Sequence, residues 1–178
     1  VSIGGGPILA LGGVSFNRNA SRTLTDEEGD RSNIGIDDAG VTAWGWTAGL
    51  MFTPDDHFTL GFNYRSLINI ESTEGTATFS NFPNSSLAPN NGDTSFTATL
   101  PLPAELALGM SYKWDKFLIA FDYNRAFWSE YNSLDLEFGN GSTSINPRNY
   151  KDSSTWRLGA QYEATEKLTV RAGYYFDE

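Results

Sequence analysis

Apolar and polar residues alternate along several stretches of the chain with a period of two residues. Between positions 41 and 53, Trp44, Trp46 and Phe52 share one parity, whereas Thr47 has the other. The same alternation returns over residues 58–70, 106–112, 117–123, 156–162 and 168–174. Successive side chains of a β-strand project to opposite sides, so the pattern predicts strands with one apolar and one polar face. No capped segment shows a sustained helical period, and we therefore expect an all-β chain.

Short and long links alternate between the predicted strands. Short turns are expected at 54–56, 114–116 and 165–166, and long polar loops near 17–40, 81–93 and 139–149. About seven long strands remain, over residues 1–16, 41–53, 58–80, 94–113, 117–138, 150–164 and 167–178. Outer-membrane β-barrels have short periplasmic turns, long extracellular loops and an even number of strands. We therefore expect residues 1–178 to be a partial antiparallel transmembrane β-barrel domain.

Aromatic residues lie at both ends of the apolar stripes. Phe117 and Phe127 have the same parity and are ten residues apart, as are Phe58 and Ile68. A tilted strand advances about 2.5 Å per residue along the membrane normal, so ten residues match an apolar band of about 25 Å. A soluble sandwich or lipocalin-like barrel also alternates, but it gives no reason for this spacing.

The composition fits a wall that is one residue thick better than a packed soluble core. Aromatic residues make up 14% of the chain and glycine contributes 18 residues, while only 39% of residues are hydrophobic. The net charge of −10 argues against a nucleic-acid partner, because phosphates need a basic surface. Six acidic residues lie between Asp26 and Asp38. They lack the ligand spacing of an EF-hand, so we interpret them as a solvated loop rather than a Ca²⁺ site.

Catalytic interpretations find little support. His57 is the single histidine and lies in a predicted turn beside Asp55 and Asp56, where no sheltered nucleophile is expected. The chain has no cysteine, no P-loop and no Gly-x-Ser-x-Gly motif. We therefore expect neither an enzyme nor a bound metal or cofactor.

The polar faces of the predicted strands carry the candidate functional residues. Charged side chains on a lipid-facing surface cost about 2–4 kcal/mol near the membrane midplane, so these residues are expected to face the lumen. The candidates are Asn63, Arg65, Asp122, Asn124, Arg157, Gln161, Glu163 and Arg171. Two interpretations are open: an internal lattice of ion pairs formed by Arg65, Asp122, Arg157 and Arg171, or arginines that attract a substrate carboxylate.

Several segments, taken in order, resemble the FadL/TodX family of outer-membrane proteins. The resemblance rests on GWTAGLMF at 45–52 with LGFNYRS at 60–66, LPAE at 102–105, FWSEY at 127–131, YKDSSTWRLG at 150–159 and RAGYYFD at 171–177. It covers most of the chain after Val41. It implies a barrel of about fourteen strands, within the range known for such barrels, of which this chain holds the middle to later part without the N-terminal hatch or the closing strands.

The resemblance also implies a function and a location. The expected function is passive uptake of long-chain fatty acids or other hydrophobic compounds across the bacterial outer membrane, by a monomer in contact with outer-membrane lipid. Phe79, Phe82 and Phe96 are predicted to be exposed loop aromatics that capture the substrate. The alternatives are a soluble lipid-binding β-barrel and a barrel with a purely structural role.

Overall fold

Nearly all regular structure in the described chain is β-strand. The structure is a computed structural model that describes residues 1–84 and 90–178. Its elements are β1 (Ser2–Asn19), β2 (Asn33–Phe52), β3 (Phe58–Arg65), β4 (Ile68–Ser80), β5 (Gly92–Leu102), β6 (Glu105–Trp114), β7 (Phe117–Ala126), the 3-10 turn η1 (Trp128–Glu130), β8 (Leu136–Phe138), β9 (Thr143–Ser144), β10 (Ser153–Thr165) and β11 (Leu168–Asp177).

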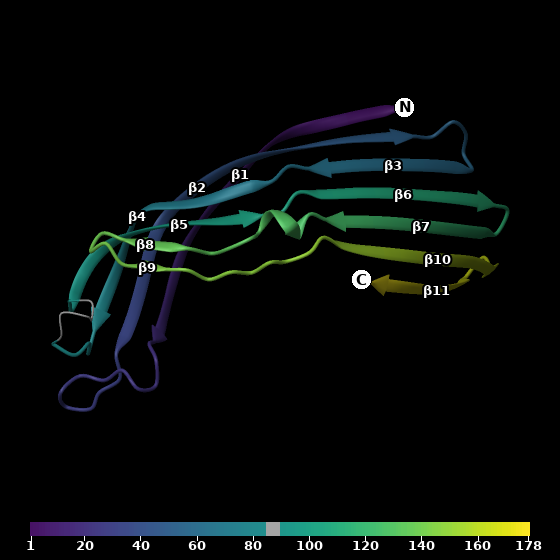
Figure 1. Cartoon of the computed structure of the whole chain (residues 1–178). Coiled ribbons are helices and arrows are strands. Elements are labelled where there is room, and N and C mark those ends of the chain that lie inside the picture. Colours follow the sequence, from purple (N-terminus) through teal and green to yellow (C-terminus); the bar gives the residue numbers. More distant parts are fainter. Residues whose placement is uncertain (85–89) are drawn as a thin grey trace.

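Within residues 1–84 and 90–178, the strands form a single eleven-stranded sheet (Figure 1). Their order is β11-β10-β7-β6-β3-β2-β4-β5-β8-β9, and β1 pairs with β2 off this path. Every pairing between named strands is antiparallel. The all-β, antiparallel fold predicted from the alternating pattern is thus confirmed.

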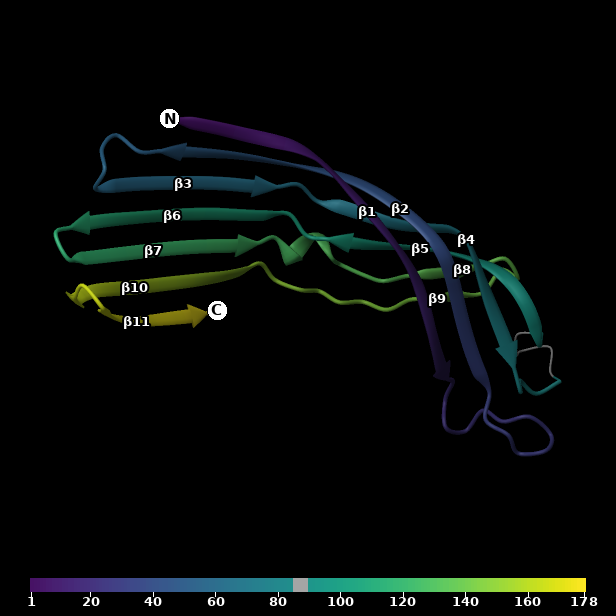
Figure 2. The same ribbon diagram turned by 180° about the vertical axis from the view of Figure 1, so that it is seen from behind.

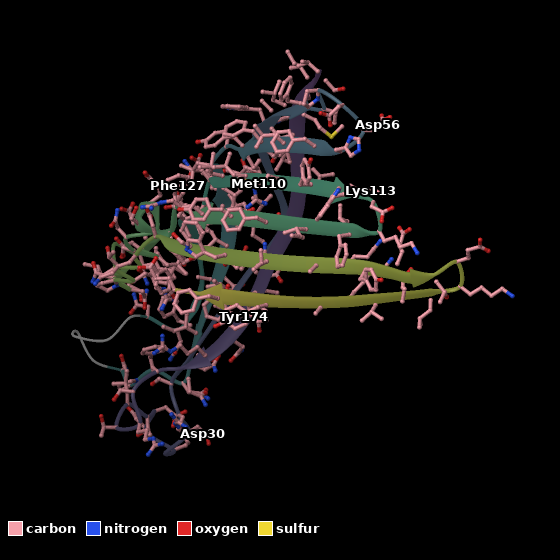
Figure 3. All side chains as sticks on the ribbon, turned by 90° about the vertical axis from the view of Figure 1, so that its right-hand side faces the viewer. Asp30, Asp56, Met110, Lys113, Phe127 and Tyr174 are labelled. Carbon is pink, nitrogen blue, oxygen red and sulfur yellow. The ribbon has the colours of Figure 1, made fainter. Side chains whose placement is uncertain are left out.

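The sheet bends across its middle, which divides it into two halves (Figures 1 and 2). The turn half contains β3, β6, β7, β10 and β11 and ends at the short turns. The loop half contains β4, β5, β8 and β9 and leads into the longer loops. β1 and β2 pair with each other through both halves. Asp30, in the loop between β1 and β2, lies far from Asp56 and Lys113, which mark the end with the short turns (Figure 3).

Three of the predicted long strands are each two strands in the structure, so the prediction of seven strands was wrong. Residues 58–80 divide into β3 and β4, 94–113 into β5 and β6, and 117–138 into β7 and β8. At the first break, the Ser66 hydroxyl accepts the Trp46 N–H at 2.9 Å in place of a backbone carbonyl. At the second, Pro103 has no N–H to offer a neighbouring strand. The chain changes its pairing partners at these breaks.

The break between β3 and β4 also exchanges the two faces of the chain. Phe62 on β3 pairs with Leu50, and both are exposed on the surface that we call the outer face. Ile68 has the same parity as Phe62 but is only 3% exposed. A side chain added at Gly45 would collide with Ile68, so Ile68 lies on the other surface, the inner face. If the alternation of faces is continued from β3 across this break, Ile68 is therefore assigned to the wrong face.

Two β-bulges make similar exchanges. The register between β1 and β2 shifts between Gly12 and Val14, and the register between β4 and β5 shifts between Ser72 and Gly75. A bulge adds one residue to one strand and so moves the following side chains to the opposite face. On β2, the buried residues accordingly change from Val41, which is 6% exposed, to Ile36, which is 5% exposed.

The loop half has a small apolar core, whereas the turn half exposes its apolar residues. The core consists of Ile36, Ala77, Phe79, Phe82, Phe96, Leu136 and Phe138. On the outer face of the turn half, Trp44 is 63%, Leu158 54% and Tyr174 72% exposed. Such a band of exposed apolar and aromatic side chains suits contact with lipid.

The loops differ from their predicted limits. The first is shorter than the predicted 17–40, because β1 continues to Asn19 and β2 already begins at Asn33. The predicted loop 139–149 contains the short strand β9. Residues 85–89 of the predicted loop 81–93 lie outside the described residues. In the described ranges, no helix has the length and apolar character needed to cross a membrane.

Candidate functional site

The strand register brings all eight predicted polar residues to the inner face of the turn half. Directly paired residues of an antiparallel sheet project to the same side. One row across the sheet runs through Gly61, Gly109, Asp122 and Arg157, and a neighbouring row contains Asn63. The remaining members follow by the same pairings on β3, β7, β10 and β11, namely Arg65, Asn124, Gln161, Glu163 and Arg171. Whether this face lines a lumen stays a prediction.

The charged members form separate pairs rather than one lattice. Arg157 Nη1 lies 3.1 Å from Asp122 Oδ1, across the pairing of β10 with β7. Arg171 donates from Nε to the Gln161 amide oxygen at 2.7 Å. The Arg157 and Asp122 side chains are 50% and 47% exposed, so their ion pair contributes at most about 1 kcal/mol to stability.

Arg65 has a partner that the sequence analysis overlooked. Its Nη2 lies 2.9 Å from Glu105 Oε1, and the same nitrogen donates to the Pro103 carbonyl at 3.4 Å. Glu105 has the parity opposite to Leu106 and Leu108, which would have assigned it to the polar face. This pair holds together β3 and β6 where the sheet bends.

Glycines on the inner face leave space next to these polar residues. Gly61, Gly109 and Gly49 border a shallow groove of 730 Å³, together with Asn63 and Asp122. Side chains at these positions would fill the groove. The groove gives the turn half a smooth inner surface of backbone and polar groups.

An apolar cavity of 190 Å³ lies in the loop half. It opens where β2 and β4 separate: β4 pairs with β2 only at residues 33–37 of β2, and β3 pairs with β2 only from Thr47 onward. Its walls come from β1, β2, β4 and β5 and from the segment around β8. The lining residues are Ala10, Leu11, Gly12, Gly13, Val14, Phe16, Ile36, Val41, Ile70, Ser72, Phe96, Ala98, Leu100, Leu134 and Leu136.

A second, larger pocket adjoins this cavity and carries two arginines. Its volume is 570 Å³, and it shares Phe16 and Ile36, among others, with the apolar cavity. Arg18 of β1 and Arg148 of the segment between β9 and β10 line it. Neither guanidinium forms an ion pair with any residue in the described ranges. The two pockets together offer an apolar compartment beside a cationic one.

Arg18 and Arg148 were missed because both lie in segments that the sequence analysis assigned to loops, 17–40 and 139–149. The parity of β1 would have indicated Arg18, since it continues the inner series of Val14 and Phe16. No comparable sequence signal was present for Arg148. It reaches the pocket only because the strands around β8 and β9 fold against β5.

Phe79, Phe82 and Phe96 are not exposed loop aromatics, and that prediction was wrong. Their exposed fractions are 3%, 4% and 1%. Phe79 and Phe96 belong to β4 and β5, and Phe82 packs at 5.5 Å against the Phe79 ring. Their apolar side chains point into the core instead of toward solvent. Of the three, Phe96 lines the apolar cavity.

His57 lies in the short turn between β2 and β3, as predicted. Asp55 accepts hydrogen bonds from the backbone N–H groups of Phe58 at 2.9 Å and His57 at 2.8 Å. These two hydrogen bonds lower the pKa of the Asp55 carboxyl from its ordinary value, and the bond from Phe58 has the larger effect. The arrangement caps a turn. Among the described residues, no three His, Cys, Asp or Glu side chains are grouped to hold a metal ion.

Comparison with known proteins identifies relatives across the whole chain. The sequence profile of the family described as "Outer membrane protein transport protein (OMPP1/FadL/TodX)" matches residues 1–178. Outer membrane protein P1 of Haemophilus influenzae is 33% identical over 150 residues, which cover 84% of this chain and 32% of that protein. The 47 kDa outer membrane protein of Pasteurella multocida is 29% identical over 144 residues, 76% of this chain and 34% of that protein. The chain thus spans about a third of the length of these relatives.

Solved structures share the fold. A Pseudomonas aeruginosa FadL homologue superposes with a TM-score of 0.70 at 21% identity, over 99% of this chain and 46% of that one. The Ralstonia pickettii toluene transporter TbuX gives a TM-score of 0.66 at 21% identity, over 99% of this chain and 51% of that one. At these identities the likeness concerns the fold.

Proposed function

Because the chain belongs to the outer-membrane transport protein family OMPP1/FadL/TodX, we propose that it forms part of the wall of a channel that takes up hydrophobic compounds. The observation that carries this proposal is the apolar cavity of 190 Å³ beside the pocket with Arg18 and Arg148. Solved relatives include two proteins described as toluene transporters. Their structures share only the fold with this chain, so the proposal rests on the cavity itself.

The cavity has the size and character to take a small apolar group. An apolar cavity of about 150 Å³ lined by Leu, Ile and Phe side chains stays dry and binds benzene. Transfer of such a solute from water into an apolar cavity lowers its free energy. We therefore propose passive passage, in which the solute first occupies the cavity and then moves along the inner face of the turn half. The eight predicted polar residues, from Asn63 to Arg171, would line that route.

The arginine pocket extends the proposal to fatty acids. A carboxylate accepts strong, often bidentate hydrogen bonds from a guanidinium. Arg18 and Arg148 would hold the carboxylate, and the shared wall at Phe16 and Ile36 would lead the acyl chain into the apolar cavity. This replaces the earlier interpretation in which inner-face arginines of the turn half attract the carboxylate, since Arg65 and Arg157 already have acidic partners.

The outer face weighs against a soluble lipid-binding barrel. Such a protein would bury its large aromatic side chains, but Trp46 is 50% and Phe62 40% exposed here. A purely structural barrel is the remaining alternative, and it would gain nothing from an apolar cavity next to two arginines.

The test uses the full-length protein that contains this chain, expressed in cells that lack their own copy. Ala98→Trp would fill the cavity, because Ala98 lines it. Thr97→Trp is the matched control, since Thr97 is the exposed neighbour on the opposite face of β5. We expect Ala98→Trp to reduce binding and uptake of labelled toluene and oleate at least about tenfold, equivalent to about 1.4 kcal/mol, with little effect of Thr97→Trp.

The arginines are tested separately with Arg18→Ala and Arg148→Ala. Each is expected to weaken oleate binding about tenfold or more, because hydrogen bonds to charged groups contribute about 1.5–3 kcal/mol, and to leave toluene binding unchanged. Equal effects of the two tryptophan variants, at equal levels in the outer membrane, would refute uptake through the cavity and favour the structural barrel.

A further inference from the structure

Among the described residues that line the apolar cavity, Ser72 carries the only polar side chain. It lies on the inner face of β4, next to the bulge between Ser72 and Gly75, and is 5% exposed. Its hydroxyl is hydrogen-bonded to Asp38 Oδ2 at 2.5 Å. Asp38 lies at the corresponding bulge of β2, where it is paired with Val14.

The direction of this hydrogen bond follows from the chemistry of the two groups. An ionised carboxylate can only accept, so Ser72 donates its hydrogen to Asp38. The distance is typical of a hydroxyl donating to a charged oxygen, which forms a strong bond. The other carboxylate oxygen of Asp38 accepts the Gly40 N–H at 3.1 Å, which orients the side chain.

The Ser72 hydroxyl is therefore not free to donate to a molecule in the cavity. Its oxygen retains lone pairs and can accept a hydrogen bond. A ligand hydroxyl placed among purely apolar residues would lose its hydrogen bonds to water, at a considerable cost in free energy. A ligand hydroxyl next to Ser72 would regain one of them by donating.

We propose that Ser72, held by Asp38, enables the cavity to bind compounds with a hydroxyl group at their buried end, which the same cavity without this hydroxyl would bind more weakly relative to hydrocarbons of the same shape. Phenols and alcohols are the ligand class that fits. The inference rests on the proposed function, since it assumes that the cavity binds substrate. It assigns Ser72 as the residue that contacts the ligand hydroxyl and Asp38 as the residue that positions Ser72.

A matched pair of ligands tests this proposal. 4-Methylphenol and 1,4-dimethylbenzene have the same shape and differ by one hydroxyl in place of a methyl group. Their dissociation constants would be measured with the purified full-length protein in detergent and compared as a ratio. In Ser72→Ala, we expect the preference for 4-methylphenol relative to 1,4-dimethylbenzene to fall about three- to tenfold, the contribution of one hydrogen bond.

Two further variants separate a local effect from a general one. Ser95→Ala removes an exposed hydroxyl from β5 outside the cavity and is expected to leave the ratio unchanged. Asp38→Asn weakens the hydrogen bond that the Ser72 hydroxyl donates to residue 38. We expect the ratio of the two dissociation constants to move in the same direction as in Ser72→Ala, by a smaller factor.

The outcomes distinguish this inference from the proposed function. If both compounds bind and the ratio is the same in the unmodified protein and in Ser72→Ala, the role of Ser72 is refuted while uptake through the cavity stands. If neither compound binds to any variant, the proposed function itself fails. If Ser72→Ala does not fold, the ratio in Asp38→Asn decides: an unchanged ratio refutes the inference.

Discussion

Replacing Gly75 with alanine should destabilise the loop half. Gly75 lies at the bulge of β4, and a Cβ atom there would overlap the ring of Phe96. That ring is 1% exposed and belongs to the core, so it has no free space into which to move. In Gly75→Ala, either the ring or the β4 backbone must shift.

The size of the effect follows from two opposing contributions. Overpacking a core by one carbon costs about 1–3 kcal/mol. A glycine-to-alanine change also lowers the conformational entropy of the unfolded chain, which offsets this cost by about 0.4–1 kcal/mol. We therefore expect the free energy of unfolding to fall by about 1.3 kcal/mol, within a range of about 0 to 2.6 kcal/mol. Gly159→Ala is the matched control, because a Cβ at Gly159 meets no atom within 4 Å, and this variant should be unchanged or slightly more stable.

The assay is urea unfolding of the full-length protein in detergent micelles, analysed by linear extrapolation. Phe96→Ala and the double variant Gly75→Ala/Phe96→Ala complete a double-mutant cycle. Phe96→Ala alone should cost about 3–5 kcal/mol. Once the ring is gone, the additional alanine at Gly75 should cost nothing. Strict additivity, or equal stability of Gly75→Ala and Gly159→Ala, would refute the assigned contact.

Two further predictions test the faces and the turns of the sheet. Leu158→Arg places a charge on the outer face and should reduce stability in membranes by about 2–4 kcal/mol. Gly159→Arg, at the neighbouring position on the inner face, should have little effect, because a Cβ atom there meets no other atom within 4 Å. Equal urea midpoints of the two variants in lipid vesicles would contradict the assignment of faces. The bonds from Phe58 and His57 lower the pKa of Asp55 below 3.8, so its contribution to stability is complete above that value and is lost as pH falls through the lowered pKa. The stability difference between the unmodified protein and Asp55→Asn should accordingly be constant near neutral pH and shrink in acid, and a difference that grows on acidification would contradict the assigned hydrogen bonds.

The sequence predicted those features that depend on local alternation. Within one uninterrupted strand, parity decides the face, so Asn63, Asp122 and Arg157 were correctly placed on a common surface. The short turns were likewise predicted, because turn residues such as Pro54 and Asp55 interrupt the alternation.

The features that parity failed to predict depend on changes of register. Ile68 continues the parity of Phe62 but lies on the opposite face, because regular strand pairing is interrupted at Ser66, between β3 and β4. The apolar cavity arises where β2 and β4 separate, and no local pattern indicates that separation. The burial of Phe96 follows from the pairing of β5 with both β4 and β8, which are distant in the chain.

The continuous pairing of β2 with β1 restricts how the length of this protein can vary in evolution. Loss of one residue between Val41 and Trp46 would rotate one part of β2 by a full alternation relative to the other. Either Trp46 would turn toward the inner face, or Val41 would leave it. Changes of two residues preserve both faces, whereas the bulge between Asp38 and Val41 can lose its extra residue without exchanging the faces. Insertions and deletions in homologous chains should therefore gather at this bulge, at the breaks after β3, β5 and β7 and in the loops, and occur elsewhere within β2 only in even numbers.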